Sequence, residues 1–96
     1  MSKLSLKRVT LEENVETAVT FNNVCGKYLV KNFTEGDIFV SFDANFNESE
    51  AVKIKSNYAQ VVVGNEEYQW TENYKTSTIY IKGSAGEVEV QQLCYR

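Results

Sequence analysis

The residues that could carry out chemistry in this 96-residue chain are 13 acidic side chains, seven serines and two cysteines, without any histidine. Histidine is the most common general base and metal ligand, so the serines lack their usual activator. A carboxylate pair of the glycosidase type is arithmetically possible. However, acids such as Glu87 and Glu89 occupy alternating outward positions of a strand pattern, where they favour solubility. The sequence therefore predicts a protein that is not an enzyme and uses no cofactor.

One asparagine-rich segment resembles the start of a calcium-binding loop. Asp43, Asn45 and Asn47 place oxygen ligands at the first, third and fifth positions of such a loop. The pattern then fails, because Glu48 replaces the required glycine and Ile54 replaces the bidentate glutamate at the twelfth position. We therefore interpret the segment as a turn held by asparagine side chains and predict no metal site.

An aromatic group and a basic group are the candidates for binding. Tyr68, Trp70 and Tyr74 recur at near-even spacing and could stack on sugars, although aromatic side chains more often fill a core or a subunit interface. Three cations near the N-terminus could steer it onto an acidic protein surface, or could simply solvate the end of a strand. The predicted partner-binding residues are Lys3, Lys7, Arg8, Tyr68, Trp70 and Tyr74.

The charge balance and hydropathy exclude several classes of partner. The net charge is −3 and the pI about 4.9, and three clustered cations are too few for a surface that neutralises nucleic-acid phosphates. No apolar run reaches the length of a signal peptide or a membrane-spanning helix. We therefore expect no nucleic acid or membrane as partner, and synthesis in a cytoplasm without a signal peptide.

Two cysteines lie near opposite ends of the chain. Cys25 and Cys94 could form a disulfide that closes most of the domain, worth up to about 4 kcal/mol. In a reducing cytoplasm they would instead be two small buried thiols, which is the interpretation that the compartment favours. The sequence leaves the pairing open.

Short alternating runs recur about every ten residues, which is the spacing of an all-β sandwich or barrel. Proline is absent and glycine scarce, so nine asparagines supply most of the turn signals. We predict a single domain over residues 1–96, a small two-sheet antiparallel β-sandwich of seven or eight short strands, with a small β-barrel as the alternative. Residues 1–10 form an N-terminal arm or an edge strand. The expected strands are residues 4–10, 15–21, 27–33, 37–42, 51–55, 60–63, 77–82 and 87–93.

The clearest local pattern is a predicted hairpin. Residues 27–33 and 37–42 are separated by Thr34-Glu35-Gly36, and a glycine in the last position of such a connection favours a left-handed bulge. In the second strand, side chains at even positions from residue 38 share one apolar face. Residues 60–63 read as a more fully buried strand, although the sequence leaves open whether this strand is central or is an edge covered by a neighbour.

Three segments together resemble a known kind of protein. They are Lys27-Tyr-Leu-Val-Lys-Asn-Phe-Thr-Glu-Gly-Asp-Ile-Phe-Val-Ser-Phe42, Ala51-Val-Lys-Ile-Lys55 and Gly86-Glu-Val-Glu-Val-Gln-Gln-Leu93. In this order and spacing they are similar to small β-sandwich structural proteins from the virions of tailed bacteriophages. The resemblance covers residues 27–93 in three blocks and transfers no binding residue.

The resemblance implies a non-enzymatic virion protein, with an auxiliary protein that decorates or stabilises the capsid as the first expectation. Its partner would be the major capsid protein or another virion protein, bound by a homo-oligomer or by many lattice-bound copies. A position in the tail, neck or connector is the alternative. Further alternatives are a sugar-binding adhesion module and a small phage-encoded inhibitor of a host protein.

Overall fold

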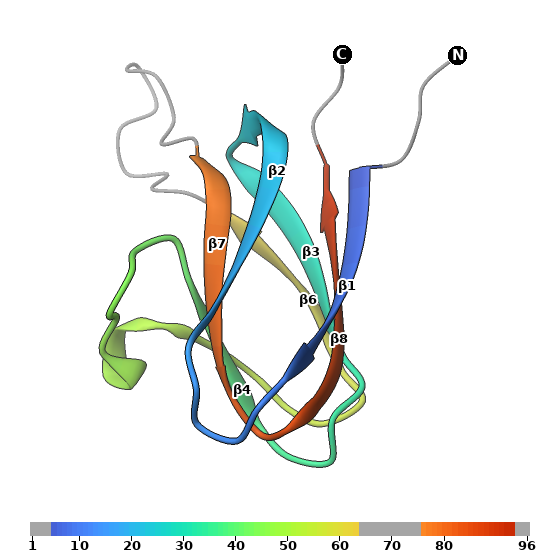
Figure 1. The fold of residues 1–96 in the computed structure, drawn as a ribbon, viewed down its shortest axis with the longest axis vertical. Helices are drawn as coiled ribbons and strands as arrows, with labels where there is room; N and C mark the ends of the chain where they lie inside the picture. Colours follow the sequence, from blue (N-terminus) through green and yellow to red (C-terminus); the bar gives the residue numbers. More distant parts are fainter. Residues whose placement is uncertain (1–4, 64–75, 94–96) are drawn as a thin grey trace.

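Two antiparallel sheets of four strands pack face to face in the computed structural model, which describes residues 5–63 and 76–93 (Figure 1). Sheet A has the strand order β1-β8-β3-β6, and sheet B the order β2-β7-β4-β5. The strands are β1 (Ser5–Leu11), β2 (Thr17–Cys25), β3 (Lys27–Asn32), β4 (Ile38–Ser41), β5 (Val52–Ile54), β6 (Ala59–Val63), β7 (Thr76–Gly83) and β8 (Gly86–Gln92), and a short 3-10 helix, η1, spans Glu48–Glu50. The predicted all-β sandwich is confirmed. In the described ranges, no helix is long and apolar enough to cross a membrane.

The core lies between the sheets and is built from alternate residues of the strands. Burial follows the period of two predicted from the sequence, because successive side chains of a strand point to opposite faces. Pairs of fully buried side chains come from β4, β7 and β8, while their intervening neighbours on β4 and β7 face outward. These pairs are Ile38 with Val40, Ile79 with Ile81, and Val88 with Val90. The remaining buried hydrophobic residues are Leu11, Val19, Phe21, Cys25, Tyr28, Val30, Ile54 and Val62.

The predicted hairpin is wrong. β3 pairs with β6 and β8, whereas β4 pairs with β5 and β7, so the chain between Asn32 and Ile38 crosses from sheet A to sheet B. Gly36 does not have the positive φ expected of a bulge glycine. The connection is a corner of the sandwich, and side-chain hydrogen bonds determine its path.

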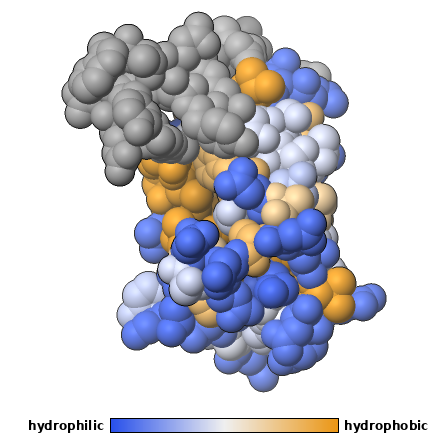
Figure 2. Space-filling view, turned by 90° about the vertical axis from the view of Figure 1, so that its left-hand side faces the viewer, coloured by the Kyte–Doolittle hydropathy of each residue, from blue (hydrophilic) through white to orange (hydrophobic). Residues whose placement is uncertain are grey.

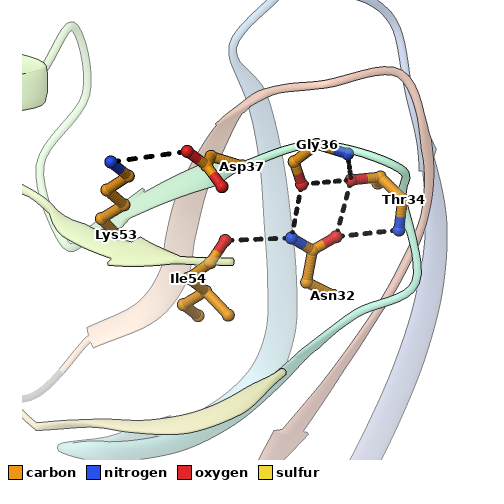
Figure 3. Close-up of polar contacts among 6 residues, drawn as sticks. All are labelled: Asn32, Thr34, Gly36, Asp37, Lys53 and Ile54. Atoms are coloured by element: carbon orange, nitrogen blue, oxygen red, sulfur yellow. Dashed lines mark hydrogen bonds and ion pairs between the residues drawn. The ribbon is translucent and has the colours of Figure 1, made fainter. Parts of the chain in front are cut away.

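Asn32 organises this corner from inside the protein (Figure 3). Its side chain is almost completely buried and donates to the carbonyl oxygens of Gly36, at 2.9 Å, and Ile54, at 3.0 Å. Its Oδ1 accepts from the backbone N–H of Thr34, at 2.8 Å, and from the Thr34 hydroxyl, at 2.7 Å. These bonds tie β3 to the corner and to β5, so they replace the backbone ladder that a hairpin would have formed.

The second strand also differs from its prediction, and it ends at a buried cysteine. β2 begins at Thr17 and extends to Cys25, with a register shift against β7 between Thr20 and Cys25. Cys25 is fully buried and disulfide-bonded, so the interpretation of a free buried thiol is wrong for this residue. Cys94 lies outside the described residues.

A buried tyrosine joins the two sheets near this end of the molecule. Tyr28 lies on β3 of sheet A, and its hydroxyl donates to the carbonyl oxygen of Thr76 on β7 of sheet B, at 2.5 Å. The same hydroxyl accepts from Gln92 Nε2, at 3.1 Å. Burial raises the pKa of Tyr28, against the smaller lowering effect of its hydrogen bond to Gln92. The hydrogen-bonded tyrosine fixes how sheet A sits on sheet B.

The expectation of a more fully buried strand at residues 60–63 is wrong. β6 is an edge strand of sheet A, paired with β3 on one side. Only Val62 is buried, while Val61 and Val63 are 43% and 40% exposed. An uninterrupted apolar run does not distinguish a strand buried on both faces from an edge strand with apolar side chains on its outer face.

Candidate interaction surface

Two of the six predicted partner-binding residues fall within the described residues. Lys7 and Arg8 lie on β1, which is an edge strand of sheet A paired with β8 in continuous register. The other four lie outside the described residues: Lys3, Tyr68, Trp70 and Tyr74. Their association into one binding surface therefore stays a prediction.

Lys7 lies at the rim between the two sheets. Its neighbour across the β1–β8 ladder is the buried Val90, so alternation places the lysine on the inner side of sheet A. The Lys7 Nζ lies 5.8 Å from the centroid of the Phe21 ring on β2. A cation over an aromatic face is weakly attractive, and here it covers the open edge of the core.

Arg8 belongs to a row of charges that crosses three strands on the outer face of sheet A. It lies directly opposite Glu89 on β8, and Glu89 lies directly opposite Lys31 on β3. Arg8 Nε is 3.0 Å from Glu89 Oε1, and Lys31 Nζ is 3.3 Å from Glu89 Oε2. The Glu89 side chain is 7% exposed, whereas that of Arg8 is 62% exposed. Arg8 therefore remains available to a partner while it holds Glu89 in place.

The sequence analysis interpreted Glu89 as an outward side chain that only favours solubility. The burial of Glu89 shows that this interpretation is wrong. It faces outward as predicted, but the two cations close over it. The hydrogen bond from Arg8 is the largest cause that lowers the pKa of Glu89; burial opposes it, and the bond and charge of Lys31 add to it. A lowered pKa favours the ionised form in the folded protein, so this carboxylate stabilises the fold above its unfolded pKa and loses that effect as the pH falls.

Glu89→Gln is expected to lower stability at neutral pH and to have progressively less effect as the pH falls below about 4.5. The reason is that acid protonates the wild-type carboxyl and removes the same charge. Urea denaturation of both proteins between about pH 3 and pH 7 measures the difference. Glu87→Gln, at an exposed outward position of the same strand, is the matched control and is expected to change stability little. A difference between wild type and Glu89→Gln that stays constant with pH would contradict the proposed role of the charge.

A row of mostly apolar side chains lies next to the charged row on the same face. Leu6 on β1 and Leu29 on β3 both lie opposite Gln91 on β8, and Leu29 lies opposite Val61 on β6. Leu6 and Leu29 are partly exposed. Four strands therefore contribute to one outward-facing line, which we term the apolar row: Leu6, Gln91, Leu29 and Val61.

The sequence analysis did not identify the apolar row. Leu6 and Leu29 were visible as members of alternating strands, but alternation alone does not reveal which strands become neighbours. The register of β1, β8, β3 and β6 was the missing information. Because charged residues are usually absent from the centre of an interface, the apolar row and the β6 edge are the best candidates for a protein contact in the described part of the chain.

Sheet B, on the opposite side of the sandwich, carries polar interactions. On the left-hand side of the molecule as drawn in Figure 1, hydrophilic side chains cover most of the lower half, and apolar side chains gather above them (Figure 2). Lys82 on β7 lies 5.7 Å from the Phe46 ring centroid and 3.6 Å from a carboxylate oxygen of Glu48. Lys53 on β5 pairs with Asp37 at 3.4 Å (Figure 3). The Lys82 contacts attach the loop before β5 to sheet B.

The asparagine-rich segment forms the turn that the sequence predicted. Asn47 caps η1, and its Oδ1 accepts from both the backbone N–H and the hydroxyl of Ser49, at 3.1 Å each. Asn45 adopts a positive φ of 55°. Across residues 5–63 and 76–93, no group of three or more acidic or cysteine side chains is placed to hold a metal ion.

No protein-family model, curated protein or solved structure matches this chain significantly.

Proposed function

We propose that this protein is a non-enzymatic structural component of a bacteriophage virion, an auxiliary protein that decorates or stabilises the capsid. The observation that carries the proposal is the outer face of sheet A, where the apolar row and an exposed apolar edge strand lie on one side of a rigid sandwich. A sheet face of this kind suits a broad protein contact. The resemblance of residues 27–42, 51–55 and 86–93 to virion proteins supports the assignment of the partner.

The hydrogen bonding of the buried polar groups suits a structural role. Asn32, Thr34, Glu89 and Gln92 are the buried polar or charged residues of the described ranges, and their side-chain bonds hold corners, strands or sheets together. Within these ranges every buried side-chain nitrogen or oxygen atom has a hydrogen-bond partner. Buried polar groups that are satisfied within the protein stabilise one arrangement of the two sheets, which suits a structural role.

The symmetry of a capsid makes a modest contact sufficient. Each copy needs only weak affinity when the same contact is repeated over a lattice, particularly if the bound copies also touch one another. The predicted partner is the major capsid protein, contacted by the apolar row together with the N-terminal arm. Tail, neck and connector proteins present repeated surfaces too, and copy number separates these positions.

Quantitative mass spectrometry of density-purified particles tests the proposal. A ratio of order one or one-third copy per major capsid subunit is expected for lattice decoration. A ratio of a few per hundred would assign the protein to the tail or neck. Absence from the particles would overturn the virion role and favour an inhibitor of a host protein.

A pair of surface variants identifies the docking face. Leu29→Lys places a charge in the middle of the apolar row on sheet A, and Phe39→Lys makes the same type of change at an outward position of β4 on sheet B. We expect Leu29→Lys to lower the copies bound per particle by about tenfold or more, and Phe39→Lys to leave them nearly unchanged. Deletion of residues 1–8 and Trp70→Ala test the arm and the aromatic group in the same assay. If only Phe39→Lys lost binding and all other variants retained it, the contact would lie on sheet B instead.

A further inference from the structure

Within residues 5–63 and 76–93 the sandwich has four edge strands, and three of them carry features that discourage pairing with another strand. β1 presents the cations Lys7 and Arg8. β5 has only three residues, of which Lys53 is one. β2 is interrupted by the register shift between Thr20 and Cys25. Charges, short length and irregular register are the usual ways in which soluble proteins prevent edge-to-edge association.

The fourth edge, β6, has none of these features. Its sequence is Ala-Gln-Val-Val-Val, without charge, proline or glycine, in a chain of which 24% is charged. Its register against β3 is regular from Ala59 to Val63. Val61 and Val63 are large apolar side chains left 43% and 40% exposed. An edge this regular and apolar is expected to be covered by another strand.

The direction of the backbone groups of β6 follows from its register. The N–H of Asn32 donates to the carbonyl oxygen of Tyr58, at 2.9 Å, so residues 32 and 58 form a hydrogen-bonding pair at the end of the β3–β6 ladder that keeps one of its two bonds, since the carbonyl oxygen of Asn32 accepts from Asn57 instead. Such pairs alternate along an antiparallel ladder, so Gln60 and Val62 direct their backbone groups toward β3. The other positions of β6 direct their N–H and C=O groups away from β3: Ala59, Val61 and Val63.

The strand can therefore pair with itself. We propose that two copies of this chain associate through their β6 strands, antiparallel about a two-fold axis at Val61. Val61 then lies opposite Val61 of the second copy, and Ala59 opposite its Val63. Each of these three residues offers one donor and one acceptor at the edge, and the three side chains on the outer face are all apolar.

A second copy fits this edge better than a different protein strand. Because β6 carries no charge, it would not select a charged partner and would not repel an identical strand. The two-fold axis maximises the overlap of the three edge-directed residues, and isologous two-fold contacts are the most common in soluble oligomers. Pairing also aligns the apolar rows of both copies into one surface. The inference concerns the isolated protein and does not depend on the virion role.

Analytical ultracentrifugation of the purified protein tests the association. We expect a species of twice the 11.0 kDa chain mass, with a dissociation constant below about 0.1 mM. Val61→Lys is expected to weaken association by about tenfold or more. Val61→Pro removes an edge-directed N–H that β3 does not use, so it is expected to have the same effect without unfolding the sheet. Val24→Lys, at an exposed valine of β2, is the matched control and remains dimeric.

Disulfide cross-linking tests the register. Under a mild added oxidant, Val61→Cys is expected to form a covalent dimer, whereas Val24→Cys is not. Ala59→Cys alone is expected to cross-link poorly, but efficiently when mixed with Val63→Cys, because these positions face each other across the axis. A monomeric wild-type protein, or equal effects of Val61→Lys and Val24→Lys, would overturn the proposal. So would a monomer whose Val61→Pro variant no longer binds particles, because proline keeps an apolar side chain in the apolar row and removes only the edge-directed N–H, and that result assigns the β6 edge to another protein.

Discussion

Asn32→Ala is expected to lower the free energy of unfolding by about 3 kcal/mol or more. The Asn32 side chain makes four hydrogen bonds inside the protein, two as donor and two as acceptor. Alanine leaves the carbonyl oxygen of Ile54 and the N–H of Thr34 without these partners in a buried corner. Each unsatisfied buried group destabilises a protein by about 1–3 kcal/mol, and equilibrium urea denaturation measures the sum.

Asn47→Ala is the matched control for Asn32→Ala. Asn47 makes the same kind of local bonds to the residue two positions later, but it is exposed at the start of η1. Water replaces those bonds, so the expected loss is about 1 kcal/mol or less. Equal losses for the two variants would show that burial does not determine the contribution of the Asn32 network.

Gly83→Ala is expected to destabilise the protein by about 3 kcal/mol or more, which is the second large effect. Gly83 has a φ of 149°, which side chains rarely tolerate. A Cβ at this position would lie 2.5 Å from the carbonyl oxygen of Asp37 and 2.8 Å from the Cα of Ile38. Both atoms belong to the backbone entering β4, so relief requires β4 to move away from β7. Thermal and urea denaturation of the variant measure the loss.

Gly36→Ala is the appropriate comparison for Gly83→Ala. A Cβ on Gly36 would meet the Ser84 side chain at 3.0 Å, and a side chain at the surface adjusts more easily than a backbone. The φ of Gly36 is not positive, so alanine introduces no comparable backbone strain. We expect a loss of about 1 kcal/mol or less. A larger loss at Gly36 than at Gly83 would contradict the close approach of β7 and β4.

The strands could be predicted well because each carries its own periodic signal. Ile79 and Ile81 alternate with polar residues, and the structure buries both as expected. The turns were predicted for a similar local reason. All non-glycine residues with positive φ in the described ranges are asparagines, the residue type that tolerates this conformation best: Asn14, Asn45 and Asn57.

Strand neighbours could not be predicted, because pairing depends on residues far apart in the chain. The Thr34-Glu35-Gly36 connection has the length of a hairpin, yet the buried bonds of Asn32 send the chain into the other sheet. Nothing local distinguishes an asparagine that ends a strand in solvent from one that bonds to Ile54 across the core. The same limitation applies to β6, whose apolar run is compatible with a central or an edge strand.

The candidate interaction surface was likewise predicted only in part from the sequence. Sequence reasoning selected Lys7 and Arg8 from their charge, and both are accessible on the edge strand β1. It did not reveal that Arg8 and Lys31 close over Glu89 from either side, because those three residues come from three strands. It also missed the apolar row, which exists only once β1, β8, β3 and β6 are aligned.

The sequence by itself determined the all-β class, the positions of most strands, the inward alternation and the asparagine turns. These properties depend on backbone preferences and side-chain period within a few residues. Only the tertiary structure decided which strand lies beside which, that residues 32–38 cross between sheets, and that β6 is an edge with exposed valines. The physical reason is that sheet order follows from burying the apolar faces of distant strands together and satisfying every buried polar group, which are conditions on the whole chain.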